Sequence, residues 1–246
     1  MNDGYLNMPP RELDGHFRVE ARFYEFRGKS ATYPCRDLLE IHRRRTGSAF
    51  EADAVFIMMN PGKSKPVEDV DSAELRDAKL VPTMPDSTQY QLMRLMGMQG
   101  WTRVKVLNLS DLRESASQKF FKRAREFEDR EGHDGHSVFS ATRRAELTSA
   151  LCRRTAAPVV VAWGVNRALR ALATNALRAL SEVPFLGFRH EMGEWAFRHP
   201  LPRNALAQER WRNDIVARLQ GGEQLSDHRT LRQQHGVCYV GTSQIS

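Results

Sequence analysis

The chain has 246 residues, 41% of them hydrophobic, and this length fits one α/β domain better than two. Its 37 Lys and Arg against 30 Asp and Glu give a net charge of +7 and a pI near 9.6, which suits either a nucleic-acid partner or a merely basic soluble enzyme. Its three cysteines form no CxxC pair, so neither a zinc site nor an iron–sulfur cluster is indicated. We see neither a signal peptide nor a membrane span, and we expect a soluble cytoplasmic protein.

Apolar periodicity and turn residues predict strands that alternate with helices. In the first half of the chain, we predict a strand at 16–26, a helix at 35–45, a strand at 54–59 and a long irregular or partly helical connection at 63–87. A helix at 86–100, with Asp86 and Ser87 as capping candidates, and a strand at 103–112 follow. In the second half, we predict helices at 115–136 and 139–156, a strand at 158–164, a helix at 165–180, a strand at 184–190, a hairpin-like segment at 191–204 and a helix at 206–219.

This alternation predicts an α/β fold class, in the form of a three-layer α/β/α sandwich with a short, mostly parallel central sheet. One domain would span 1–220, and 221–246 would be a polar C-terminal tail. In sheets of this kind, functional sites form where the parallel strands end.

Polar residues stand at several of these strand ends. The apolar run 54–59 stops at Asn-Pro-Gly, residues 60–62, and the next predicted strand stops at Asn108. A third strand ends in Trp-Gly at 163–164, and the segment 199–204, which reads His-Pro-Leu-Pro-Arg-Asn, follows the last predicted strand. We therefore expect a functional site at the ends of these strands.

The motifs of several large enzyme classes are missing: G-x-S-x-G, the P-loop, H-E-x-x-H and G-x-G-x-x-G. What remains is asparagines, one histidine and basic residues. An asparagine is no strong base, but it can orient a water, which suits a reaction whose leaving group departs first. Cleavage of an N-glycosidic bond is such a reaction, and a neutral histidine N–H aimed at the departing base would stabilise its negative charge.

The same residues resemble the motifs of the uracil-DNA glycosylase superfamily, closest to its single-strand-selective monofunctional and mismatch-specific (thymine/uracil) branches. The first motif of these branches, G-[MI]-N-P-G, is similar to residues 58–62, and the second, H-P-S-P-R-N, is similar to residues 199–204. Between them lie VKVLNL with Asn108 and VVVAWG with the Trp-Gly pair, in the family's order. The resemblance spans residues 50–219.

The resemblance implies a monofunctional DNA glycosylase that removes a deaminated or C5-modified (hydroxymethylated or glycosylated) pyrimidine and leaves an abasic site. Asn60 would position the attacking water, and His199 would donate to O2 of the base. Asn108 would hydrogen-bond the Watson–Crick edge of a flipped base, and Gly62 would leave room at C5. No metal or organic cofactor is implied.

Further residues would hold the substrate. Met59 and Pro61 would line the base pocket, and Tyr90 is a candidate to stack on the base, although its helical spacing fits a core position about as well. The partner would be DNA, single- or double-stranded, contacted by a monomer that does not bind membranes. The residues expected to contact DNA are Lys63 and Lys65, through phosphates, Arg203, in the gap left in the duplex, and Asn204.

The chain departs from the family pattern at two positions, Met58 in place of Gly and Leu201 in place of Ser. It also resembles, more loosely, a bacterial family of uncharacterised proteins with N-P-[ST], N-L, W-G and H-P-L signals. Two other functions stay open: a non-catalytic nucleic-acid-binding protein on the same fold, and a hydrolase of free nucleosides or nucleotides. Within the glycosylase hypothesis, the role is either repair of damaged bases or antiviral defence against hypermodified phage DNA.

Overall fold

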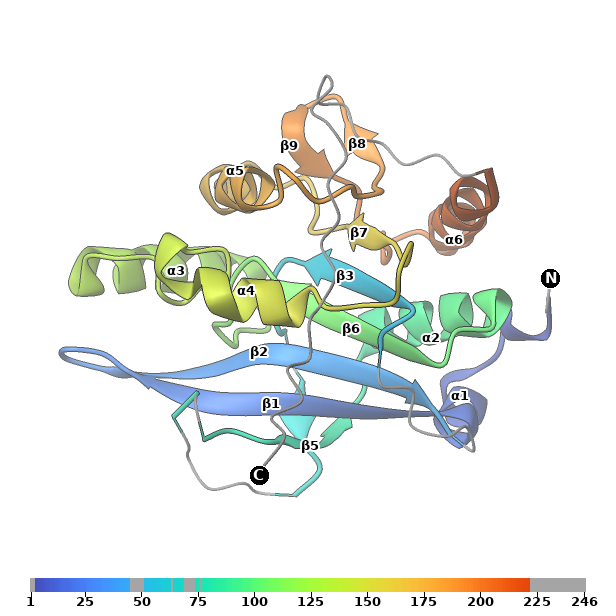
Figure 1. Ribbon diagram of the computed structural model, residues 1–246, viewed down its shortest axis with the longest axis horizontal. Helices are drawn as coiled ribbons and strands as arrows, with labels where there is room; N and C mark the ends of the chain where they lie inside the picture. Colours follow the sequence, from blue (N-terminus) through green and yellow to red (C-terminus); the bar gives the residue numbers. More distant parts are fainter. Residues whose placement is uncertain (1–2, 45–50, 63, 69–73, 76, 222–246) are drawn as a thin grey trace, which may run out of the picture.

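The computed structural model is an α/β fold in which a seven-stranded sheet separates two groups of helices (Figure 1). Lys63 and the predicted tail beyond Gly221 lie outside the residues that the structure describes, which are 3–44, 51–62, 64–68, 74–75 and 77–221. No helix within those ranges is both long and apolar enough to cross a bilayer.

The strands form one large sheet, in the order β4-β5-β1-β2-β6-β3-β7, and a separate two-stranded sheet. The strands of the large sheet are β1 (Phe17–Arg27), β2 (Thr32–Arg43), β3 (Ala54–Met58), β4 (Lys65–Pro66), β5 (Leu80–Met84), β6 (Arg103–Asn108) and β7 (Val159–Val161), and the small sheet pairs β8 (Arg189–His190) with β9 (Gly193–Phe197). The α-helices are α1 (Pro10–His16), α2 (Ser87–Gln99), α3 (Ser117–Glu131), α4 (Arg144–Ala150), α5 (Arg170–Ala179) and α6 (Ala205–Gly221), and the short 3-10 helices are η1 (Asp3–Tyr5), η2 (Ala141–Arg143) and η3 (Arg167–Leu169).

The direction of the strands confirms the α/β class and corrects the predicted sheet. β3 runs parallel to β6 and to β7, whereas β2 is antiparallel to β6, β1 to β2 and to β5, and β4 to β5. The mostly parallel order therefore holds only for β6-β3-β7. The rest is antiparallel because β1 and β2 form a long hairpin, which needs only a short turn and no crossover helix.

The helix predicted at 35–45 is wrong, because these residues belong to the central strand β2. Leu39 and Ile41 are completely buried on one face of that strand, and β2 pairs with β1 on one side and β6 on the other. Leu38 and Leu39 are adjacent, so the run had no clean alternation that would separate strand from helix. Pairing with β1 and β6 on its two sides therefore makes this segment a strand.

Most other elements lie where they were predicted, with shifted ends. β1, β3, β6 and β7 are confirmed, as are the helices α2, α3, α5 and α6. The connection predicted at 63–87 contains the short strands β4 and β5, and the helix predicted at 139–156 is reduced to η2 and α4. The strand predicted at 184–190 shortens to β8, with Leu186 forming an isolated bridge to Val160.

Two apolar clusters pack on the two faces of the sheet. Side chains of β3 alternate between them, with Val55 and Ile57 facing the cluster that holds α3, α4 and α5, and Phe56 and Met58 facing the cluster that holds α1, α2 and α6. Figure 1 shows the two helix groups on either side of the sheet. Because both faces of β3 are covered, residues beyond Met58 emerge at the rim of the sheet.

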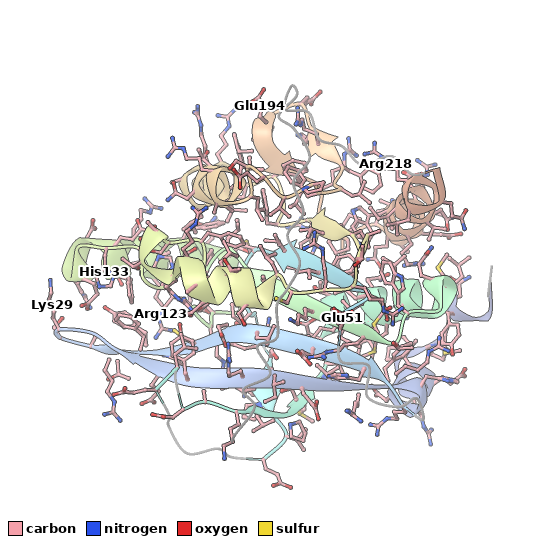
Figure 2. All side chains as sticks on the ribbon, viewed as in Figure 1. Lys29, Glu51, Arg123, His133, Glu194 and Arg218 are labelled. Carbon is pink, nitrogen blue, oxygen red and sulfur yellow. The ribbon has the colours of Figure 1, made fainter. Side chains whose placement is uncertain are left out.

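The tip of the β1–β2 hairpin is held against the end of α3. The backbone N–H of Lys29 donates to the Glu131 carboxylate at 2.9 Å, and its Nζ donates to the Glu131 carbonyl at 2.9 Å. The ring centroids of Phe26 and Tyr33 each lie 4.8 Å from that of Phe127. Figure 2 shows Lys29 at this tip, below His133 at the end of α3. Phe26 and Tyr33 thus join the hairpin to the apolar core through Phe127.

We predict that Leu39→Ala lowers the free energy of unfolding by roughly 2–5 kcal/mol, because it leaves a cavity where a completely buried side chain of β2 was packed. Leu80→Ala, at a position 38% exposed on β5, is the matched control and should change it by less than about 0.5 kcal/mol. Urea denaturation measures both. Equal effects would contradict the placement of 35–43 as a central strand.

Candidate active site

The ends of β3 and β6 lie next to each other. In the parallel register, Met58 is opposite Asn108, and the N–H of Leu109 donates to the Met58 carbonyl at 2.8 Å. Asn60 follows two residues after Met58. The pairing therefore brings two of the predicted site residues, Asn60 and Asn108, to the same edge of the sheet.

The side chain of Asn60 is half-buried and held by one end. Its Nδ2 donates to the carbonyl of Glu114 at 2.7 Å. Its Oδ1 has no hydrogen-bond partner in the part of the chain that the structure describes. The amide is thus oriented with its acceptor unused, which is the arrangement needed to hold a water through one of the water's protons.

The turn after Asn60 brings this edge beside the start of α2. Gly62 has φ +64, in the left-handed region that favours glycine, and a Cβ there would meet Asp86 Oδ2 at 3.7 Å. Asp86 is the N-cap of α2, as predicted, and forms a full capping box with Gln89. Its carboxylate therefore has a fixed position next to the site.

Asn108 has no exposed surface, and its amide is engaged within the protein. In the orientation that its neighbours require, its side-chain oxygen accepts from Nη2 of Arg36 at 3.1 Å, and its nitrogen donates to the Asn60 carbonyl at 3.2 Å. Asn108 thus lies beneath Asn60 and ties it to β2. Both polar atoms of the Asn108 side chain, which is predicted to read a base edge, therefore contact protein groups in this structure.

His199 lies between β9 and α6, half-buried, with its Nδ1 accepting from the Leu201 N–H at 3.1 Å. In the neutral ring, the proton then sits on Nε2. Burial lowers the pKa of His199 to about 4, although the charge of Asp86 and the Leu201 contact oppose this shift. His199 is therefore neutral at pH 7 and offers an Nε2–H donor.

Asp86 links the parts of this site. Its charge acts on His199 and also on Arg36, and its carboxylate lies beside Gly62. The ends of β3 and β6, the start of α2 and the segment after β9 therefore converge. We call this set of side chains, Asn60, Gly62, Asp86, Asn108 and His199, the strand-end cluster.

Two predicted site residues have structural contacts of their own. The Tyr90 hydroxyl donates to Asp14 at 3.1 Å, and the ring packs against the cluster that holds α2, which fits the core alternative. Asn204 Oδ1 accepts from the Leu206 N–H at 2.8 Å at the start of α6. A capping contact of this kind accounts for Asn204 without DNA.

The remaining predicted residues lie close in the sequence to Asn60, Gly62 or His199. Met59 is half-buried and packs against the apolar cluster of α3, and Pro61 is buried. Lys65, on β4, and Arg203 are exposed. The structure thus leaves Lys65 and Arg203 accessible to a partner.

Two arginines beside the strand-end cluster, Arg36 and Arg113, were not among the predicted site residues. Arg36 lies in the segment that was wrongly predicted as a helix, and Arg113 lies just after β6. Neither residue belongs to a motif. The only usable signal was the correct pairing of β2 with β6, because that pairing brings residue 36 to the end of β6.

Two cavities in the described part of the chain lie away from the strand-end cluster. Cavities of about 340 and 220 Å³ are lined by residues of α4 with the α5–β8 loop, and by α2 with α6, and neither is lined by the strand-end cluster. Over the described ranges, His, Cys, Asp and Glu do not gather in threes that could hold a metal ion.

No family model, curated protein or solved structure matches this chain.

We predict that His199 titrates with a midpoint near pH 4 and carries its proton on Nε2 above that pH. Because its pKa is lower in the folded than in the unfolded chain, folding stability should be lost as pH falls from the ordinary histidine range toward 4. Nitrogen-detected NMR of the imidazole measures both midpoint and tautomer. A midpoint near the ordinary value of about 6.5 would contradict the burial of this ring.

Proposed function

We propose that this protein is a monofunctional DNA glycosylase with a uracil-DNA-glycosylase-like three-layer architecture. It hydrolyses the N-glycosidic bond of a deaminated or C5-modified pyrimidine and leaves an abasic site. The observation that carries the proposal is Asn60, whose amide N–H is anchored to Glu114 while its oxygen is unused. The neutral donor of His199 supports it.

In this mechanism the base departs before water attacks. The sugar then resembles an oxocarbenium ion, so the water needs orientation more than deprotonation. Asn60 Oδ1 accepts from that water and places it against the sugar carbon. His199 Nε2–H donates to the base as negative charge develops on it, and a neutral donor does so without giving up its proton. No metal or cofactor takes part.

The substrate would be DNA from which the nucleotide is flipped, since base chemistry cannot reach a stacked base. The net charge of +7 favours a polyanion, and the exposed Lys65 and Arg203 follow shortly after Gly62 and His199 in the sequence. Gly62 lets a C5 substituent lie beside the base. We further propose that the protein acts in the cytoplasm as a monomer, either in repair or against phages whose DNA carries hypermodified pyrimidines.

We predict that Asn60→Ala and His199→Ala each reduce base excision by about 10²–10³-fold without loss of folding, because each removes a group that acts only in the transition state. His190→Ala is the matched control, because His190 makes the same kind of contact as His199. Its Nδ1 accepts from the N–H of Met192, two residues later in the chain. Excision is measured on DNA containing uracil, 5-hydroxymethyluracil or glycosylated 5-hydroxymethylcytosine, followed by alkaline cleavage.

Inactivity of the wild-type protein on a broad modified-base panel would refute the glycosylase proposal. Retained biological activity in Asn60→Ala would instead favour a non-catalytic nucleic-acid-binding protein. Plating modified and unmodified phages on expressing cells separates the roles, and equal plaque counts would remove the defensive one.

We predict that Lys65→Ala weakens DNA binding similarly on all sequences and reduces the salt dependence of binding by about one phosphate contact. Lys122→Ala is the control, because Lys122 is 78% exposed on α3, where it pairs only weakly with Glu126. Binding isotherms at several salt concentrations give both slopes. Identical slopes for the two variants would exclude Lys65 from the DNA contact.

A further inference from the structure

Arg36 is a buried cation without a carboxylate partner. Only 2% of its surface is exposed, and its Nε and Nη1 have no hydrogen-bond partner in the described part of the chain. Its Nη2 reaches only the neutral oxygen of Asn108. Burial lowers the pKa of Arg36 to about 10, so it stays charged at pH 7. Buried charges are normally paired, and this one presents two unused donors instead.

Asp37 and Asp111, two of the acidic residues whose charge acts on Arg36, are engaged by other side chains. Asp37 receives a two-pronged contact from Arg22, with Nε donating at 2.9 Å. Asp111 accepts from Arg143 at 2.5 Å and from the Tyr24 hydroxyl at 2.8 Å. Both carboxylates thus already contact another side chain, and neither is paired with Arg36, although Oδ1 of Asp111 has no partner within the described ranges. A bound anion would supply the counter-charge that Arg36 lacks.

Asp86 does not fill this role either. Its Oδ1 accepts from the N–H groups of Thr88 and Gln89, which holds the carboxylate at the start of α2. It acts on Arg36 only through its charge.

Arg113 adds a second cation at the same place. The strand pairing puts Arg36 opposite Phe23, and the Arg113 guanidinium lies 4.8 Å from the centre of the Phe23 ring. Burial has the largest effect on the pKa of Arg36 and lowers it, and the charge of Asp86 raises it. Repulsion from Arg113 is the next largest effect and lowers the pKa again. Two guanidinium groups thus face one region, and the repulsion between them favours an anion there.

A hydroxyl completes the donor set. Arg113 Nη2 donates to the Ser64 carbonyl at 3.0 Å, which brings Ser64 beside the guanidinium. Ser64 is 1% exposed, and its Oγ has no partner within the described ranges, nor does Nε of Arg113. The unused groups of Arg36 and Arg113 are donors only, and the Ser64 hydroxyl can donate as well.

We propose that Arg36, Arg113 and Ser64 form a binding site for a phosphoryl group of the substrate, next to the strand-end cluster. A phosphoryl group offers several anionic oxygens that match two planar guanidinium forks and a hydroxyl, and desolvated contacts of this kind are strong. The proposal rests on the proposed function for the source of that group. It comes from a phosphodiester of the flipped nucleotide, or from a free nucleotide if the substrate is small.

The test compares ligands that differ only in phosphate. Shifts of the thermal unfolding midpoint are measured at constant ionic strength with deoxyuridine, with deoxyuridine 5′-monophosphate and with a pentanucleotide that lacks terminal phosphates. The monophosphate, the pentanucleotide or both should stabilise the protein more than the nucleoside does. Arg36→Met and Arg113→Met should each weaken that binding about tenfold or more, and Ser64→Ala by less.

Arg18→Met is the matched control, because it removes a charge from the same hairpin at an exposed position. It should leave the phosphate-dependent shift unchanged. If Arg36→Met does not fold, Arg113→Met and Ser64→Ala decide the test. Binding of the monophosphate alone identifies a free nucleotide as the source, and Arg36-dependent binding of the pentanucleotide identifies DNA.

The proposal would be overturned if no phosphate-containing ligand raised the unfolding midpoint more than the nucleoside does. It would also be overturned if that difference persisted in both arginine variants. The readout needs no catalysis, so the two proposals fail separately. Phosphate binding without base excision refutes only the glycosylase. Excision that is unaffected by Arg36→Met, in a protein without a phosphate-dependent shift, refutes only the phosphoryl site.

Discussion

The amide of Asn108 is the contact on which the site depends. It is completely buried, and it joins three strands: its own strand β6, the Asn60 carbonyl just beyond β3, and Arg36 on β2. A side chain with both a donor and an acceptor is needed here, because a carboxylate would repel the Asn60 carbonyl and an apolar group would leave Arg36 without any neutral ligand. The position of Asn60 therefore follows from polar contacts inside the sheet, and not from the turn alone.

This arrangement is costly to stability. Arg36, Arg113 and Ser64 keep buried polar atoms without partners within the described ranges, where an ordinary core would hold apolar side chains. Such groups are more often found where function requires them than where packing does. His199 is a similar case. Burial lowers its pKa to about 4 and so keeps the ring neutral, whereas in solvent the ring would take up a proton near the ordinary histidine pKa.

Local patterns in the sequence were sufficient for much of the fold. The apolar run of β3, the capping residue Asp86 and the strand-ending Asn108 are local signals, and each lies in the structure where it was expected. The antiparallel half of the sheet was not accessible in this way, because the pairing of β2 with β6 joins residues about sixty positions apart and Leu38-Leu39 hides the alternation. Missing that pairing meant missing Arg36. Asn204 shows that a motif position can also serve as a helix cap, which the motif alone does not reveal.

The placement of the β1–β2 hairpin has a consequence for how the molecule meets other copies of itself. By pairing with β6, β2 covers an edge that the parallel strands would otherwise expose. The two strands left at the borders of the sheet are short, three residues in β7 and two in β4, and the latter contains Pro66, which has no N–H to donate. A neighbouring chain that tried to pair with β7 or β4 would find few hydrogen-bonding groups in a row. The hairpin that brings Arg36 to the site thus also removes the edge of β6 as a place where another copy of the chain could pair.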